Sequence, residues 1–241
     1  MIDPSPLWDF DDPAGSEQRL RKAAAAATGD DRAAWQTQVA RALGLQDRYD
    51  EGQALLDEVA AGARGGEVPA RVALERGRLR RSSGHPEAAR QDFEEAVRLA
   101  GDAGLEELQV DALHMVALVV PPDEALEAGR YALDVARAAT DPRARDWDAS
   151  LLNNLGMAQA DAGDHVAALV SFEEALEARE RIGDIGRIRV ARWMIAWALR
   201  HLGRTDEALA MQRELRTELT ADGQHDPYVD EEISLLEGKQ G

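Results

Sequence analysis

The chain has 241 residues and a formal net charge of −18, with 46 acidic against 28 basic residues. Such a negative field disfavours nucleic acid and anionic membrane surfaces as partners. The absence of cysteine excludes disulfides, thiol catalysis and thiolate metal sites. Alanine dominates the apolar residues, aromatic residues make up only 5%, and β-branched runs of strand length are almost absent. This composition indicates an all-α protein.

The chain begins MIDPSPLWDFDDP, which is acidic and lacks the basic and apolar regions of a signal peptide. No apolar run approaches the roughly 18–20 residues that span a bilayer. We therefore expect a soluble, cytoplasmic protein.

Residues 1–12 are predicted to form an extended segment. Asp12 and Pro13 suit the N-cap and first turn of a helix that stops near Gly29. Trp8 and Phe10, inside the acidic segment, have two interpretations. They are a docking motif for another protein, or they cover the open end of a helical array.

Residues 147–182 contain the clearest pattern of the chain. Gly156 and Ala168 are small where two antiparallel helices would cross closely, while Leu155 and Phe172 are large enough to fill the space between them. Gly163 lies where a tight turn would join the two helices. This order of small and large residues resembles the tetratricopeptide repeat, a helix-turn-helix unit of about 34 residues.

Four weaker copies of this pattern are anchored by a small residue early in the second helix. The five predicted repeats are residues 31–63, 68–100, 105–139, 147–182 and 185–221, with anchors at Gly52, Ala89, Ala125, Ala168 and Ala208. The third repeat is the least regular, because Gly129 stands where a large residue is usual. Asp226 and Pro227 begin a capping helix over residues 227–238.

The resemblance is to bacterial tetratricopeptide repeat proteins with lengthened repeats. It implies an all-α, right-handed α-solenoid of about five helix pairs with N- and C-terminal capping helices. Each pair alone cannot bury its apolar stripe, so stacking makes one continuous core. Residues 13–241 are accordingly expected to form a single domain.

In tetratricopeptide repeat proteins the first helix of each repeat lines a concave groove that receives a peptide or a helix of a partner. The resemblance assigns groove positions in this chain to Arg41, Arg71, Arg78, His114, Asn153, Trp193 and Trp197. A groove rich in arginine within an acidic chain favours a ligand that carries carboxylate or phosphate groups. In the alternative interpretation these arginines pair with neighbouring Asp and Glu side chains and bind nothing.

Trp193 and Trp197 lie one turn apart on one side of a predicted helix. Tryptophan concentrates binding energy at interfaces, and such rings also stack on planar or cationic ligands. The alternative is that the C-terminal helix folds over both rings through Tyr228, Ile233 or Leu236.

Asn153 and Asn154 are poor helix formers unless their amide groups find partners. Asn154 matches the asparagine of the family members that clamp a C-terminal carboxylate. Those members carry basic residues at two positions of the next repeat, where this chain has Val190 and Met194. The known clamp is therefore not reproduced, and we expect Asn154 to contact the backbone of a ligand.

Asp111 and His114 are three residues apart on a predicted helix, so the carboxylate could orient the imidazole as a general base. No nucleophile motif, phosphate-binding loop or metal-ligand spacing accompanies them. We expect no catalytic residue, no metal and no cofactor.

The sequence thus predicts a non-enzymatic scaffold that binds a peptide or helix, with acidic groups, through Arg41, Arg78, His114, Asn153, Asn154, Trp193 and Trp197. A different hypothesis is a small-molecule sensor or unusual enzyme whose pocket forms inside a closed superhelix around Asp111, His114 and Asn153. A third is self-association through the ends or the outer face of the array.

Overall fold

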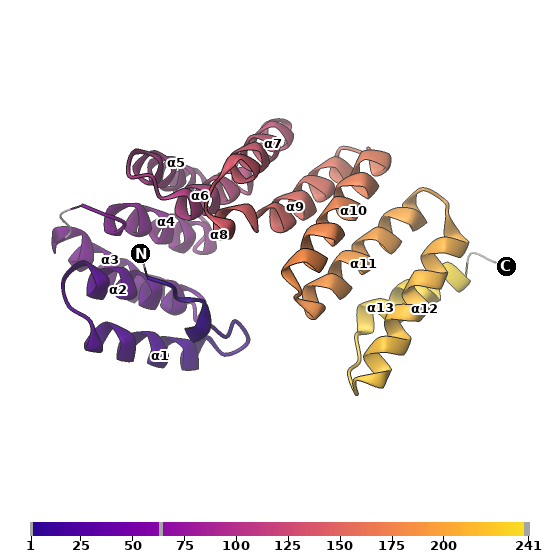
Figure 1. Cartoon of the computed structure of the whole chain (residues 1–241), viewed down its shortest axis with the longest axis horizontal. Coiled ribbons are helices and arrows are strands. Elements are labelled where there is room, and N and C mark those ends of the chain that lie inside the picture. Colours follow the sequence, from indigo (N-terminus) through magenta and orange to yellow (C-terminus); the bar gives the residue numbers. More distant parts are fainter. Residues whose placement is uncertain (1, 63–64, 239–241) are drawn as a thin grey trace. The chain divides into compact units, whose positions relative to one another are not determined.

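The computed structural model of the chain describes residues 2–62 and 65–238 (Figure 1). All regular elements in these two ranges are helical, which confirms the predicted all-α fold. The elements are η1 (Ser5–Leu7), a 3₁₀ turn, and the α-helices α1 (Pro13–Ala26), α2 (Gly29–Gly44), α3 (Tyr49–Gly62), α4 (Val68–Ser82), α5 (Pro86–Asp102), α6 (Glu106–Ala117), α7 (Pro122–Ala138), α8 (Pro142–Arg145), α9 (Asp148–Asp161), α10 (His165–Ile182), α11 (Ile185–His201), α12 (Thr205–Ala221) and α13 (Pro227–Glu237). No helix in the described ranges is both long and apolar enough to cross a membrane.

The chain divides into two compact units. Unit 1 comprises the described residues up to Pro121 together with Ala139–Ala144, and unit 2 comprises Pro122–Ala138 and the described residues from Arg145 onward. In unit 1, α2 packs against α1, α3 and α4, and α5 packs against α4 and α6. In unit 2, α9 packs against α7 and α10, and α10 to α13 follow as successive neighbours. The helices of the predicted third repeat fall in different units, and the single domain over residues 13–241 stays a prediction.

Four helices begin at aspartates that act as N-caps. The carboxylates of Asp12, Asp164, Asp184 and Asp226 each accept a hydrogen bond from a backbone N–H in the first turn of α1, α10, α11 and α13, respectively. Such caps satisfy N–H groups that have no partner within the helix. The predicted starts of α1 and of the C-terminal helix are confirmed.

The turns between paired helices require a left-handed backbone. Gly163 between α9 and α10 has a φ of 82°, and Gly203 between α11 and α12 has a φ of 75°. Asp47 has a φ of 59° in the turn from α2 to α3, where aspartate is one of the few non-glycine residues that tolerate this conformation.

Paired helices approach each other closely at glycines. Gly156 on α9 lies against the ring of Phe172 on α10, and Gly77 on α4 lies against Phe93 on α5. Both phenylalanines are fully buried. The pattern of small and large residues in the sequence therefore corresponds to these two contacts, one in each unit.

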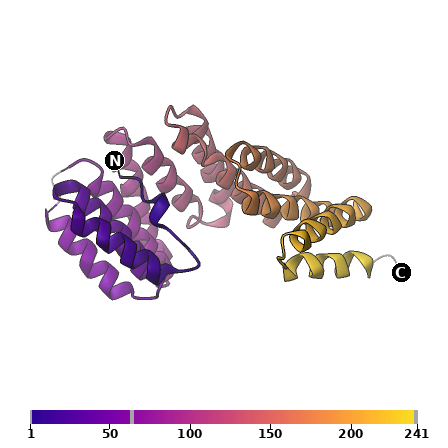
Figure 2. The ribbon, with the colours of Figure 1, turned by 60° about the horizontal axis from the view of Figure 1, so that its bottom comes forward.

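The predicted N-terminal segment of residues 1–12 is described from Ile2 onward. Figures 1 and 2 show this indigo segment turning back into α1. It includes the short turn η1, whose C-cap Trp8 returns to extended backbone.

Substitution of the glycine at a close helix crossing should destabilise unit 2. An added Cβ at Gly156 would lie 2.5 Å from Cε1 of the buried Phe172 ring. We expect Gly156→Ala to lower the free energy of unfolding by about 1–3 kcal/mol because a packed core cannot yield to this overlap. Urea unfolding followed by circular dichroism measures the change.

Gly129→Ala is the matched control in the same unit. A Cβ at Gly129 would meet Leu155 Cδ1 at 3.6 Å, an ordinary contact. The gain in helix propensity should then leave the protein as stable or more stable by up to about 1 kcal/mol. Equal destabilisation by both substitutions would contradict the role given to the close crossing.

Candidate functional site

The start of the N-terminal segment is bound to α4. The backbone N–H of Ile2 donates to Glu67 Oε1 at 3.1 Å, and its carbonyl accepts from Arg71 Nη2 at 3.4 Å. The Ile2 side chain is 8% exposed and joins the core cluster that contains Val68 and Val72. Both polar groups of this residue's backbone are thus paired with side chains of α4 or its N-cap.

The middle of the segment is fixed to α1. Arg19 Nε donates to the carbonyl of Leu7 at 2.9 Å. The backbone N–H of Asp9 donates to the hydroxyl of Ser16, which in turn donates to the Asp9 carbonyl, both at 2.9 Å. Residues 2–10 are therefore held through backbone groups at three separate positions.

The aromatic residues of the segment lie against α2. The indole N–H of Trp8 donates to Gln38 Oε1 at 3.2 Å. The rings of Trp8 and Phe10 stack with centroids 5.1 Å apart, and the Arg41 guanidinium lies 5.3 Å and 5.5 Å from the two ring centroids. This is the geometry of a cation–π contact. In the described part of the chain, Arg41 forms no ion pair.

A chain of buried polar side chains joins α2, α4 and α6. Gln38 Nε2 donates to Glu75 Oε1 at 3.2 Å, and Arg78 donates to both Glu75 Oε1 at 2.7 Å and Asp111 Oδ1 at 2.5 Å. Burial opposes the charge of Arg78, but the carboxylates of Asp111 and Glu75 raise the pKa of its guanidinium above the usual value. Burial likewise opposes the charge of Asp111, but Arg78 and Arg41 lower the pKa of its carboxyl. The charge of Arg78 is thus compensated within the protein.

His114, on α6, is a neutral imidazole at physiological pH. Burial lowers its pKa to about 4; Asp111 opposes this shift, whereas Arg78, Arg81 and Arg41 add to it. A base with so low a pKa has little driving force for proton abstraction at pH 7. Within residues 2–62 and 65–238, no group of three or more His, Asp or Glu side chains is placed to hold a metal ion.

The remaining predicted site residues lie in unit 2. Asn153 and Asn154 are half-buried on α9, and Trp193 and Trp197 are half-buried on α11. The structure thus brings Arg41, Arg78 and His114 together in unit 1 and assigns the other four to unit 2. The pocket hypothesis around Asp111, His114 and Asn153 joins residues of both units and stays a prediction.

Both tryptophans of α11 pack against the core of unit 2. That core includes Ile233 and Leu236 of α13, two of the three residues expected to fold over the rings. Tyr228, the third, is 66% exposed. Trp197 also contacts the imidazole of His201, with ring centroids 4.2 Å apart.

The acceptors that organise the unit 1 site were not predicted from the sequence. Glu67, Gln38 and Glu75 bind the N-terminal segment or the arginines, and none was singled out. One signal was present, because Glu75 precedes Arg78 by three residues and such neighbours meet on a helix.

Comparison with known proteins identifies the repeat. Family models of the tetratricopeptide repeat match residues 147–217 and residues 70–102. These two stretches of the chain are tetratricopeptide repeats. The family predicted from the sequence is thereby confirmed. No curated protein matches the chain.

Solved structures share this fold at low sequence identity. BtubC from P. vanneervenii is 17% identical with a TM-score of 0.68, and the match covers 94% of this chain and 95% of BtubC. RapI is 12% identical with a TM-score of 0.71, and the match covers 95% of this chain and 65% of RapI. The quorum sensor NprR from B. thuringiensis is 14% identical with a TM-score of 0.66, and the match covers 95% of this chain and 64% of NprR. The chain thus spans about two thirds of RapI and of NprR.

The depressed pKa of His114 predicts a loss of stability in mild acid. The unfolded chain binds a proton near pH 6.5 and the folded chain only near pH 4, so stability falls as the pH drops through this window. Between pH 7 and pH 5 the wild type should lose about 2 kcal/mol more than His114→Gln. Urea unfolding at several pH values measures the difference between the two proteins.

Other carboxylates titrate in both proteins, so only this difference reports on His114. Parallel stability curves for the wild type and His114→Gln would show that the imidazole is not buried as described.

Proposed function

We propose that this tetratricopeptide repeat protein is a non-enzymatic interaction scaffold that binds an extended, acidic and aromatic segment of a partner protein. One observation supports the proposal: the chain's own N-terminal segment, which is acidic and aromatic, lies across α2 and α4. The segment carries Asp3, Asp9 and Asp11 around the aromatic residues Trp8 and Phe10.

The contacts of the segment fall at positions that the sequence assigned to ligand binding. Arg41 covers the two aromatic rings, and Arg71 binds the carbonyl of Ile2. A face that holds one extended segment through side chains on helices is already organised for another, so a ligand would impose little ordering on the receptor.

The charges of this face support a ligand with acidic groups. Arg78 is paired directly with Glu75 and Asp111, whereas Arg41 lies against aromatic rings and feels the charges of the same two carboxylates only from beyond ion-pair distance. Arg41 is therefore the cation that remains for a carboxylate of the ligand.

A structural neighbour adds support. NprR has been solved in complex with its cognate peptide NprX, and that structure matches this chain with a TM-score of 0.58 at 13% identity. The likeness is one of fold, so the peptide chemistry proposed for this chain rests on its own residues.

Because the segment occupies the face, a partner must compete with residues 2–10. Binding of a fluorescein-labelled peptide with the sequence of residues 2–12 tests this directly. We expect the double variant Trp8→Ala, Phe10→Ala to bind this peptide at least roughly tenfold more tightly than the wild type, because its own rings no longer fill the site. Fluorescence anisotropy measures both affinities.

Adding Arg41→Glu to the double variant should weaken binding at least tenfold, since the cation is replaced by a carboxylate. Arg130→Glu, at an exposed position of α7, is the matched control with the same change of charge and should leave the affinity unchanged. Equal binding of a scrambled peptide of the same composition, or no binding to the double variant, would sink the proposal.

A further inference from the structure

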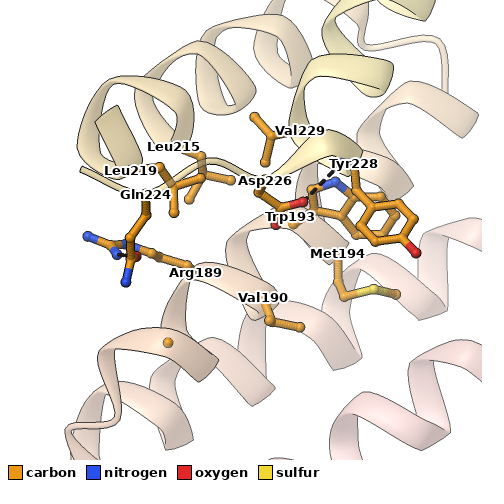
Figure 3. A pocket seen from close by; sticks show the side chains of 11 residues that line it. Arg189, Val190, Trp193, Met194, Leu215, Leu219, Gln224, Asp226, Tyr228 and Val229 are labelled. Atoms are coloured by element: carbon orange, nitrogen blue, oxygen red, sulfur yellow. Dashed lines mark hydrogen bonds between the residues drawn. The ribbon is translucent and has the colours of Figure 1, made fainter. Parts of the chain in front are cut away.

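Unit 2 contains a cavity of about 400 Å³ between α11, α12 and the start of α13 (Figure 3). Its walls are mainly apolar and include Val190, Trp193, Met194, Leu215, Leu219 and Val229. The volume falls within the range of small-molecule sites, roughly 300–1,000 Å³. Nothing in the proposed peptide face of unit 1 involves this cavity.

Two buried N–H groups on the cavity wall have no hydrogen-bond partner in the described part of the chain. They are the indole N–H of Trp193 and the Nε–H of Arg189, and the two residues lie one turn apart on α11. Glu218 Oε2 is 3.9 Å from Arg189 Nε, which is too long for a hydrogen bond. A buried donor without an acceptor costs about 1–3 kcal/mol, so two at one cavity indicate that an acceptor from outside binds there.

The cavity walls are held by specific contacts rather than by a loose helix end. Arg200 on α11 donates two hydrogen bonds to Glu232 on α13, at 2.7 Å and 2.9 Å. The carboxylate of Asp226 caps α13 by accepting from the Tyr228 N–H at 2.9 Å. The cavity is therefore formed before a ligand arrives, which lowers the ordering cost of binding.

The charges near the cavity exclude an anion as the preferred ligand. Arg189 is already paired with Asp222, and its Nη1 donates to Gln224 at 3.0 Å. Glu218 stands nearby, and Asp226 adds a further carboxylate to the lining. Glu218 is itself paired with Arg192 at 2.7 Å, and the charge of Arg189 is compensated by Asp222, so a negatively charged ligand would find no uncompensated cation there and would meet the carboxylate of Asp226.

A cationic ligand is not favoured either, since ammonium and guanidinium groups offer no acceptor to the two orphaned donors. The rim of the cavity is apolar as well: Val190 is 57% exposed and Tyr228 is 66% exposed. Exposed apolar side chains around a cavity are typical of ligand-binding sites.

We propose that this cavity binds a compact, uncharged molecule with an apolar ring-sized body and a carbonyl-type oxygen that accepts a hydrogen bond from Trp193 Nε1. The apolar walls bind the ring, and the acceptor satisfies a donor that the folded chain leaves unpaired. This site is separate from peptide binding, so its failure would leave the proposed function untouched.

Nuclear magnetic resonance of the ¹⁵N-labelled full chain tests the site, with acetophenone as the probe and benzoate as its charged counterpart. Trp193→Phe identifies the indole N–H signal of Trp193. Millimolar acetophenone should shift this signal saturably and leave the signals of Trp8, Trp35 and Trp147 in place. Benzoate should bind at least tenfold more weakly.

Val190→Trp narrows the mouth of the cavity at an exposed position and should weaken acetophenone binding at least tenfold. Val170→Trp, at an exposed position of α10, is the matched control and should change nothing. The proposal is overturned if acetophenone leaves the Trp193 signal unmoved, if benzoate binds equally well, or if Val190→Trp binds like the wild type.

Discussion

The close crossing of paired helices at glycine is the contact on which the architecture depends. At Gly156 and Gly77 the absence of a side chain lets a phenylalanine ring from the partner helix lie directly on the backbone. The buried Phe172 and Phe93 rings then fill the space between the paired helices. Helices that crossed at a larger distance would need several side chains to fill the same space. In unit 1, buried polar side chains on α2, α4 and α6 accompany this apolar packing.

A second constraint acts on these polar side chains in unit 1, because removing a charged group from water costs free energy. Arg78 is stable at its buried position because Glu75 and Asp111 both accept from it. The same pairing removes Arg78 as a receptor for an acidic ligand. Arg41 forms no ion pair with these carboxylates and lies against aromatic rings instead, so this face presents both a cation and aromatic rings.

The sequence predicted what local patterns encode and missed what distant residues decide. Asp12-Pro13 and the glycine–phenylalanine spacing of residues 147–182 follow local rules, and both were confirmed. Whether an arginine is available to a ligand depends on acceptors that lie far away in the sequence. Asp111 is such an acceptor for Arg78, and no local spacing in the sequence reveals this pairing. For the same reason the sequence left open whether Trp8 and Phe10 dock another protein or cover the end of the helical array, since their partner Arg41 lies on α2, more than 30 residues away.

The indole N–H groups of Trp8 in unit 1 and Trp193 in unit 2 differ in whether they have a hydrogen-bond acceptor. Trp8 Nε1 donates to Gln38 within the chain, so this donor is satisfied without a ligand. Trp193 Nε1 finds no acceptor among the described residues, although Arg200 and Glu232 keep its surroundings in place. A cavity that collapsed would bury apolar surface and remove the void, both favourable changes. The helices instead hold the cavity open beside donors that have no acceptor. Binding of an outside molecule that supplies the acceptor would account for this arrangement.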